Sequence, residues 1–487
     1  MRTVDRDSED LGRFGYAQQL RRTLGGFSSF AVAFSLISVF TGIFANFGHG
    51  LRQVGGAVAW SWLVVLAGQL LVAWVMADLA RRIPLSGYGY QWSSRLVNPH
   101  FGFGVGWLLL LQFLTGFPGI CATLAAQIHA AFGIGSNDSP PLAATTIAVL
   151  TLVTLTQLWG LRAAARVNDI GVWTELVGVA GVGLVLLAVA LRTGNLPGSL
   201  LQATEARTGL AAGPGAWALS LLLGAWCLTG FEAAADLAEE TVDPRRTVPR
   251  AMMASLIGSG LGGFAVLVGA VGCIRDLPAV QSADNPLVEI LRQTVGPALP
   301  VVLAIVGISI FACALAAMAT TSRLLFALGR DRMLPGSDWL SRIAPNGRSP
   351  RNAILLIWAL SSALVLGLPT LDIVTQISAV AGYLGYGGIM GAALWRASRR
   401  GSGSDPGERR PLIRIIAAMA LLWSLGVVGA LTLTPTPVAG IRTLHLPALS
   451  TAVGLLLGAG VYLTTLRGRL LRGEAGPPRS PTPPTNP

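Results

Sequence analysis

Two hydrophobic segments of this sequence are each interrupted by the dipeptide Thr-Gly, at Thr41-Gly42 and at Thr229-Gly230. Glycine costs roughly 1 kcal/mol in a helix interior, so its place in an apolar helix predicts a local break. A broken turn exposes backbone N–H and C=O groups at the centre of a membrane, where they can bind the charged ends of a small solute. We therefore interpret the two dipeptides as parts of one binding site.

At the first dipeptide, a second half-helix would begin with free N–H groups and the positive end of its dipole. We expect the backbone amides of Thr41, Gly42 and Ile43, with the hydroxyls of Ser38 and Thr41, to bind the carboxylate of a zwitterionic substrate. The alternative is that Gly42 only allows two helices to pack closely, since small residues are common at membrane helix interfaces.

At the second dipeptide, the first half-helix would end near Leu228 and Thr229. Its last carbonyls carry the negative end of the helix dipole and can accept an ammonium group. The sequence therefore predicts that Leu228, Thr229 and Gly230 bind the amino end of the substrate, opposite the first break.

A stripe of carboxylates follows the second break. Glu232 lies within the apolar span, where a charged group is expensive and usually faces a cavity, a partner or a proton path. Asp236 and Glu239 follow at four and seven residues, so all three share one helical face. We interpret Glu232 and Asp236 as proton-coupling or gating residues, whereas Glu239 and Glu240 are expected to be charges at a solvated helix end.

Glu175 lies about two turns inside another apolar span and is a second candidate for proton coupling. The alternative is that Asn168 or an arginine pairs with it and makes it structural. Gln112 is a further polar residue that we place near the site. Aromatic side chains near the breaks are either packing residues or a cage for a quaternary ammonium group. The aromatic candidates are Phe40, Phe44, Trp226, Phe231, Tyr383 and Tyr386.

The composition indicates a polytopic membrane protein, since 52% of the 487 residues are hydrophobic and 12% are charged. A helix that crosses the hydrocarbon core needs roughly 20 apolar residues. This template predicts an all-α protein with about twelve spans. The spans are expected near 27–50, 56–80, 102–132, 142–160, 168–191, 214–236, 250–274, 298–326, 353–369, 374–396, 413–434 and 447–467.

The net charge of +12 is not an indication of nucleic-acid binding, because most of the 35 basic residues fall in alternate loops. By the positive-inside rule these loops, with both termini, are cytoplasmic. Every basic residue is arginine, which we attribute to a GC-rich, bacterial genome, so the inner membrane is the expected location. No cleavable signal is evident, and neither the cysteines nor the histidines have the spacing of a metal site, so no cofactor is expected.

The spans divide into two groups of five that would run in opposite directions. We therefore expect inverted repeats over 25–196 and 213–396, with a cytoplasmic N-terminal tail at 1–24 and two added helices at 413–467. The proline-rich segment 468–487 is expected to be a disordered cytoplasmic tail.

Four ordered motifs resemble the amino acid–polyamine–organocation superfamily, and its amino acid/choline transporter branch in particular. They resemble its first helix, its first cytoplasmic loop, its sixth helix with the following loop, and the end of its eighth helix. The motifs are Ser35-Leu-Ile-Ser-Val-Phe-Thr-Gly42, Ile83-Pro-Leu-Ser-Gly-Tyr-Gly-Tyr-Gln-Trp92, Gly224-Ala-Trp-Cys-Leu-Thr-Gly-Phe-Glu232 with Ala238-Glu-Glu-Thr-Val-Asp-Pro-Arg-Arg-Thr-Val-Pro-Arg250, and Thr320-Thr-Ser-Arg-Leu-Leu-Phe-Ala-Leu-Gly-Arg-Asp-Arg-Met-Leu-Pro335.

The resemblance implies a five-plus-five inverted-repeat fold with discontinuous first and sixth helices, and transport of an amino acid or related amine. It implies an aromatic gate at Phe231 and an acidic residue at Glu232. Some relatives carry a lysine in helix 5 that replaces a sodium ion, whereas this chain has no lysine. We therefore expect proton coupling, with the bilayer and a small-molecule substrate as the partners. Rival interpretations are a choline or polyamine transporter, a channel, and a polytopic membrane enzyme.

Overall fold

The computed structural model describes residues 10–20, 22–134, 141–159, 161–194, 200, 212–343, 349–367, 371–399, 410–434 and 445–478. Helices dominate these residues, and the pairing of Leu24 with Thr241 is an isolated parallel bridge between segments far apart in the chain. The helices are α2 (Gly26–Ile37), α3 (Val39–Val54), α4 (Val58–Arg82), α5 (Tyr88–Leu96), α6 (Pro99–Phe132), α7 (Leu142–Trp159), α8 (Leu161–Thr193), α10 (Pro214–Ser220), α11 (Leu222–Cys227), α12 (Ala233–Asp236), α13 (Pro244–Gly272), α14 (Leu277–Ser282), α15 (Pro286–Val295), α16 (Leu299–Arg330), α17 (Ser337–Leu340), α18 (Arg351–Gly367), α19 (Leu371–Arg399), α20 (Arg410–Leu433), α21 (Leu446–Val461) and α22 (Arg467–Leu471).

The fold is that of an all-α polytopic membrane protein, as predicted. Within the described ranges, nine helical stretches are long and apolar enough to cross a bilayer, and two shorter apolar helices cover 214–227 and 351–367. Each of the twelve expected spans corresponds to a helix or to a set of consecutive helices. The first is divided into α2 and α3, and the sixth into α10, α11 and α12, so both helices expected to be discontinuous are confirmed.

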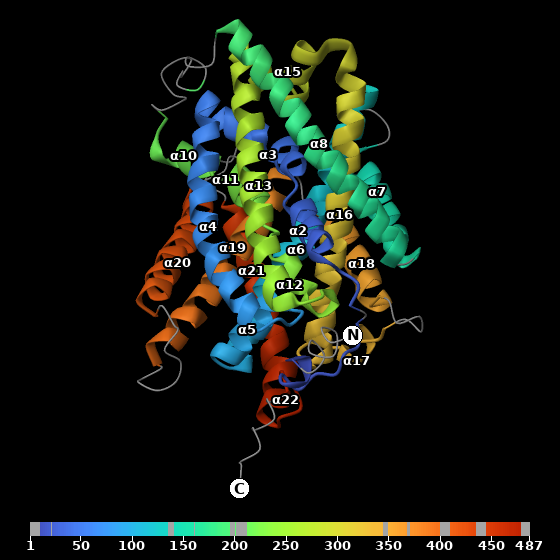
Figure 1. Ribbon diagram of the computed structural model, residues 1–487, viewed down its shortest axis with the longest axis vertical. Coiled ribbons are helices and arrows are strands. Elements are labelled where there is room, and N and C mark those ends of the chain that lie inside the picture. The colour runs from blue at the N-terminus through green and yellow to red at the C-terminus, as the bar shows by residue number, and fades with distance from the viewer. Residues whose placement is uncertain are drawn as a thin grey trace.

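Most helices run along the long axis of the molecule, and the two broken helices lie among them (Figure 1). The half-helix α2 packs against α8, α13 and α16, whereas α3 packs against α6 and α11. The two breaks therefore lie in the interior of the helix bundle, where their backbone polar groups are shielded from lipid.

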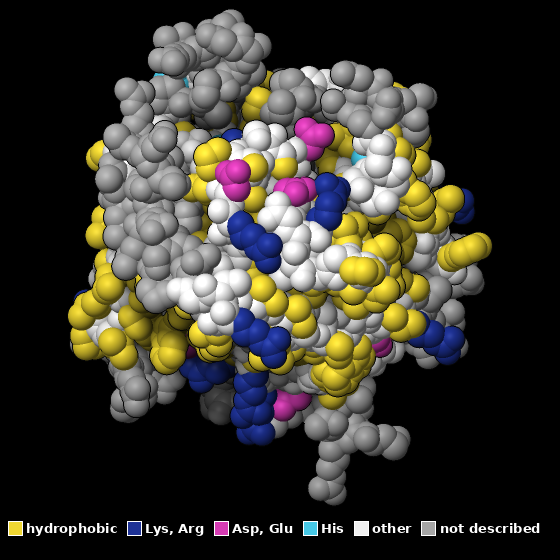
Figure 2. Space-filling model, turned by 90° about the horizontal axis from the view of Figure 1, so that it is seen from above, with side chains coloured by type: hydrophobic (Ala, Val, Ile, Leu, Met, Phe, Trp, Pro, Cys, Tyr) yellow, Lys and Arg dark blue, Asp and Glu magenta, His cyan; other side chains and the backbone are white. Residues whose placement is uncertain are grey.

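Large hydrophobic side chains are exposed along the outer helices, as at Val177, Leu422 and Leu456. In a membrane these side chains contact lipid tails, so their exposure is not a defect of packing. Figure 2 views the end of the molecule opposite the chain termini, where charged side chains lie near the centre of the face and hydrophobic ones near its edges.

Both ends of the described chain lie at the same end of the bundle, which we name the terminal face (Figure 1). Part of the segment expected to be disordered from residue 468 is ordered there. It forms α22 as far as Leu471, and the Gly476 N–H donates to the Asp331 carbonyl at 2.8 Å. The remainder of that expected tail, 479–487, lies outside the described residues. The division into repeats stays a prediction.

Candidate functional site

The first break lies at Ser38, three residues before the expected dipeptide. α2 ends at Ile37 and α3 begins at Val39, and Ser38 between them has φ 33° and ψ 96°. A positive φ is strained for a residue with a Cβ, and hydrogen bonds hold this one. The Ser38 N–H donates to the Phe34 carbonyl at 3.1 Å, and Ser38 Oγ accepts from the Thr41 hydroxyl at 2.7 Å.

Gly42 is a helical residue, which corrects the expected position of the break. Its N–H donates to the Ser38 carbonyl at 3.1 Å, so this amide is already paired. A Cβ at Gly42 would collide with the Sγ and Cβ atoms of Cys227 on α11. The glycine therefore allows α3 and α11 to approach closely. This agrees with the alternative interpretation, in which Gly42 serves helix packing.

The free amides of the first break are therefore not those that we expected. Ser38 is the N-cap of α3, and its Oγ accepts from the Thr41 N–H at 3.3 Å. Ile43 lies one turn further, where helical N–H groups pair with the carbonyl four residues earlier. The N–H groups of Val39 and Phe40 belong to the first turn of α3 and have no such carbonyl partner.

The second break lies where it was predicted. α11 ends at Cys227, and the chain becomes helical again at Ala233. Gly230 has φ 102°, a conformation that residues with a Cβ rarely adopt. The Leu228 carbonyl accepts a hydrogen bond from Gln69 Nε2 at 2.9 Å, and the Thr229 hydroxyl donates to the Trp226 carbonyl at 2.7 Å. Part of the polar backbone at this break is thus satisfied by the protein itself.

Glu232 joins the second break to two other helices. Its Oε2 accepts from the Gly230 N–H at 3.0 Å, and its Oε1 accepts from the Tyr386 hydroxyl of α19 at 2.5 Å. Gln112 Nε2 of α6 donates to the same hydroxyl oxygen at 3.4 Å. The Glu232 side chain is completely buried, and the salt bridges found among the described residues do not include it. The geometry of the break therefore depends on a buried carboxyl group.

A narrow cavity of about 40 Å³ lies between the two broken helices. Four of the expected substrate residues line it: Thr41, Gln112, Thr229 and Gly230. The other expected substrate residues are not in its lining; they are Ser38, Gly42, Ile43, Leu228, Phe231 and Tyr383. The remaining lining residues are Leu36, Ile37, Phe113, Gly116, Phe117, Ile120, Trp226, Cys227, Cys313, Ala317 and Ser378.

Gly116 and Ser378 are among the lining residues that sequence reasoning missed. Gly116 belongs to a third Thr-Gly dipeptide, a signal that the sequence does contain. Ser378 lies on α19, and its hydroxyl donates to the Gln112 carbonyl at 2.9 Å. No local motif marks Ser378, because only the packing of α19 against α6 brings it to the cavity.

Phe231 and Tyr383 form an aromatic cluster with Tyr386 beside the cavity. The ring centroids of Phe231 and Tyr386 are 6.1 Å apart, and those of Tyr383 and Tyr386 are 5.7 Å apart. Both residues are fully buried. Both rings contact Tyr386, whose hydroxyl donates to Glu232, and neither Phe231 nor Tyr383 is in the cavity lining.

The acidic stripe continues toward the terminal face. Asp236 Oδ1 accepts from the Gly87 N–H at 3.0 Å. Glu239 forms an ion pair with Arg330 at 3.0 Å, and Glu240 forms one with Arg323 at 3.0 Å. Glu239 and Glu240 are buried, so the expectation that they lie at a solvated helix end is wrong. The carboxylates stay inside the protein because arginines of α16 neutralise them.

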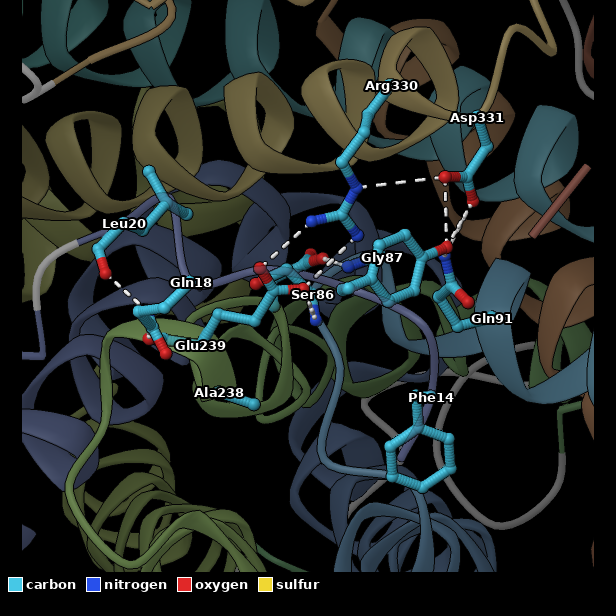
Figure 3. Close-up of polar contacts among 12 residues, drawn as sticks. Phe14, Gln18, Leu20, Ser86, Gly87, Gln91, Ala238, Glu239, Arg330 and Asp331 are labelled. Atoms are coloured by element: carbon cyan, nitrogen blue, oxygen red, sulfur yellow. Dashed lines mark hydrogen bonds and ion pairs between the residues drawn. The ribbon is translucent and has the colours of Figure 1, made fainter. Parts of the chain in front are cut away.

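A set of interlocked side chains closes the terminal face, and we name it the terminal cluster: Tyr16, Tyr90, Gln91, Glu239, Arg330 and Asp331. Figure 3 shows how Glu239 and Asp331 lie on either side of Arg330. Asp331 accepts from the Tyr16 hydroxyl at 2.7 Å and from the Tyr90 hydroxyl at 2.8 Å. Burial raises the pKa of Asp331, while Arg330 and these hydrogen bonds oppose the rise. The cluster ties the N-terminal segment to the end of α16.

Glu175 points into the interior from α8 and is completely buried. Neither of its carboxylate oxygens has a hydrogen-bond partner among the described residues. No hydrogen bond or salt bridge among the described residues joins Glu175 to Asn168 or to an arginine. The structure therefore does not support the alternative that such a pair makes Glu175 structural. The first turn of α3 packs against this part of α8, where a Cβ at Gly178 would lie 2.8 Å from the Phe40 ring.

The chain is similar to transport proteins over most of its length. A family described as "Amino acid permease" matches residues 24–457. The amino-acid permease BAT1 of Arabidopsis thaliana is 26% identical, over 74% of this chain and 75% of that protein. The low-affinity putrescine importer PlaP of Escherichia coli is 28% identical, over 66% and 69%.

A third relative, the thiamine transporter thi9 of Schizosaccharomyces pombe, is 26% identical over 78% of this chain and 71% of its own. The named relatives are transporters and not enzymes, which agrees with the absence of catalytic function predicted from the sequence. The extent of the family match settles the identity: this chain belongs to the amino acid permease family, within the amino acid–polyamine–organocation superfamily.

Proposed function

We propose that this protein is a secondary active transporter that moves an amino acid or related amine across the cell membrane by alternating access. The observation that carries the proposal is the cavity between the two broken helices, whose lining includes Thr41, Thr229 and Gly230. The lining residues are almost entirely buried, so a substrate enters only when the half-helices move. Movement of half-helices around a fixed site is how such folds alternate access.

The terminal face is the side that we propose to be cytoplasmic, because the arginine-rich loops and both termini belong there. The terminal cluster would then be a closed inner gate. It connects the N-terminal segment, α5 and α16, which must separate before a path from the cavity to the cytoplasm can open. Its hydrogen bonds stabilise the inward-closed state.

Proton coupling is proposed for Glu232. Its carboxyl group is buried, bonded to the Gly230 amide and the Tyr386 hydroxyl, and followed by Asp236 one turn on. Protonation of Glu232 removes the charge that holds both donors, so the second break and α19 would respond to it. Glu175 and Asp236 are further proposed sites of coupling or gating.

Uptake by purified protein in liposomes tests the proposal. We expect saturable uptake of amino acids or amines that an inward proton gradient stimulates and an inward sodium gradient does not. Flux that rises linearly with solute concentration would indicate a channel and contradict the proposal. Equal stimulation by sodium would reject proton coupling and leave the transporter assignment intact.

Thiol chemistry gives a prediction for the cavity itself. Cys227 and Cys313 line it, whereas Cys121 and Cys273 do not. We expect a small cationic methanethiosulfonate reagent to inhibit uptake and a transported substrate to protect against it. The C227A/C313A variant should resist the reagent, and the matched C121A/C273A variant should stay sensitive. Inhibition of both variants to the same extent would show that the cavity is not on the transport path.

The inner gate gives a second prediction. Replacing Asp331 with alanine removes the acceptor of the Tyr16 and Tyr90 hydroxyls, and bonds to a charged group contribute about 1.5–3 kcal/mol each. We expect trypsin to cleave detergent-solubilised D331A after Arg13 at least about tenfold faster than wild type. The control is D338A, because the Asp338 side chain is 84% exposed on the same face. Equal cleavage of D331A and wild type would disprove the gate.

A further inference from the structure

We propose that a groove between α6 and α21 binds an anionic phospholipid, with an acyl chain in the groove and the phosphate group at Arg467. The groove shares no residue with the transport cavity or with the terminal cluster, so the inference goes beyond the proposed function. It depends on the shape of the groove, on the polar groups at one end of it, and on an unpaired arginine.

Two helices line the groove, which has a volume of about 260 Å³. One wall belongs to α6, and the other belongs to α21 and to the π-helix Tyr462–Leu466 that follows it. The lining residues are His100, Phe103, Gly104, Trp107, Leu455, Gly458, Ala459 and Tyr462. Most of these side chains are apolar, as the surroundings of an acyl chain must be.

Small residues determine where the two helices touch and where they separate. A Cβ at Gly454 would lie 2.6 Å from Leu111, and one at Gly458 would collide with the Trp107 ring. Glycines four residues apart allow close helix approach, and Trp107 Nε1 adds a hydrogen bond to the Gly454 carbonyl at 2.8 Å. A Cβ at Gly104 would meet nothing within 4 Å. The groove is therefore open beside Gly104, near the start of α6.

The groove faces the lipid side of the molecule. The side chains of Leu455, Leu456 and Leu457 on α21 are 42–71% exposed. Gly104 and Ala459 of the lining are exposed as well. In a membrane, exposed apolar side chains of a spanning helix contact lipid tails. An acyl chain of a neighbouring lipid can therefore enter the groove from the side, without any movement of the bundle.

Polar groups lie at the end of the groove where α6 begins. His100 Nδ1 is 2.9 Å from the Tyr462 hydroxyl, and the ring centroids of the two residues are 5.9 Å apart. The Tyr462 ring also stacks on Phe103, with centroids 6.0 Å apart. Aromatic side chains with a polar end are typical of the membrane–water interface. This end of the groove is therefore where the head group of a lipid would lie.

Arg467 supplies a positive charge one turn beyond Tyr462. Its N–H donates to the Tyr462 carbonyl, so the π-helical turn places Arg467 next after Tyr462 along the axis, toward α22 and the terminal face (Figure 1). The Arg467 side chain is exposed and, among the described residues, has no ion pair or hydrogen bond. A guanidinium group can bind a phosphate through two parallel hydrogen bonds. A basic group beside a pocket between spanning helices is typical of sites for anionic head groups.

Two phospholipids with identical acyl chains test the inference, because phosphatidylglycerol carries a net negative charge and phosphatidylcholine does not. We expect native mass spectrometry of the purified full chain in detergent to show at least about fivefold tighter binding of phosphatidylglycerol as the first bound lipid. The R467Q variant should lose this preference and bind phosphatidylcholine as wild type does. The R246Q variant should keep it, because Arg246 is exposed at the start of α13, which packs against α4 and α8.

A second pair of variants tests the groove itself. We expect G104L to weaken the binding of both phospholipids at least about fivefold, because leucine would fill the open space beside Gly104. The control is G460L on α21, since Gly460 is exposed and its Cβ would also meet nothing within 4 Å, but it is not in the lining.

Three results would overturn the inference. The first is equal binding of the two phospholipids by wild type, and the second is an unchanged preference in R467Q. Arg467 is exposed, so this second result does not depend on whether G104L folds. The third is a dimer in light scattering that G104L dissociates and G460L does not, which would assign the groove to a second copy of this chain. None of these results depends on uptake, so the proposed function would stand in each case.

Discussion

Replacing Glu232 with glutamine is expected to abolish proton-driven accumulation of substrate. Glutamine keeps the size of the side chain and one acceptor oxygen, but it carries no ionisable proton. It also weakens the bonds from the Gly230 amide and the Tyr386 hydroxyl, since a bond to a charged group contributes about 1.5–3 kcal/mol. A free energy of this size corresponds to a change of about tenfold to hundredfold in an equilibrium constant. The measurement is uptake in liposomes with and without an imposed proton gradient.

Two controls separate coupling from binding in this experiment. Exchange of internal for external substrate needs no proton gradient, so E232Q should retain exchange while losing accumulation. Tyr386→Phe removes the hydroxyl that donates to Glu232 but leaves the carboxyl group, so Y386F should remain coupled with weaker affinity. Accumulation by E232Q that still follows the proton gradient would transfer the coupling role to Glu175 or Asp236.

The spans and the second break were predictable because their causes are local. Apolar runs of sufficient length form spans in any membrane protein, and a glycine with φ 102° such as Gly230 interrupts a helix wherever it occurs. The first break was misplaced for an equally local reason. Ser38 caps α3 through its own side chain, and serine is a common N-cap, but the dipeptide at 41–42 drew the prediction three residues too far.

The composition of the cavity was less predictable because it depends on which helices meet. Ser378 reaches it only through the packing of α19 against α6, and no signal in its own segment marks that position. The pairing of Glu239 with Arg330 joins residues 91 positions apart. Local patterns show that a carboxylate is present at a helix end, but they do not show which arginine neutralises it.

Enlarging the glycine on either broken helix is expected to stop transport while the protein still inserts in the membrane. The side chain of Gly42→Leu would occupy the space of Cys227 Sγ and Cβ, and that of Gly230→Leu would begin 2.7 Å from Leu36 Cγ. Overpacking a dense core costs about 1–3 kcal/mol or more, so uptake should fall at least about tenfold in both variants. The Gly181→Leu variant on α8 is the control, because its Cβ would meet nothing within 4 Å.

The two variants should differ in how they are rescued, because the two glycines have different physical roles. Gly42 is helical, so a larger residue there lacks only space. Adding Cys227→Gly to Gly42→Ala should therefore restore part of the uptake. The atom nearest to the new Cβ would then be the Cys227 Cα, at 3.1 Å. Gly230 has φ 102°, so Gly230→Ala stays strained even when Leu36→Ala makes room. Rescue of Gly230→Ala by Leu36→Ala would mean that the second break needs only space. The left-handed turn would then not be what orients the Glu232 carboxyl.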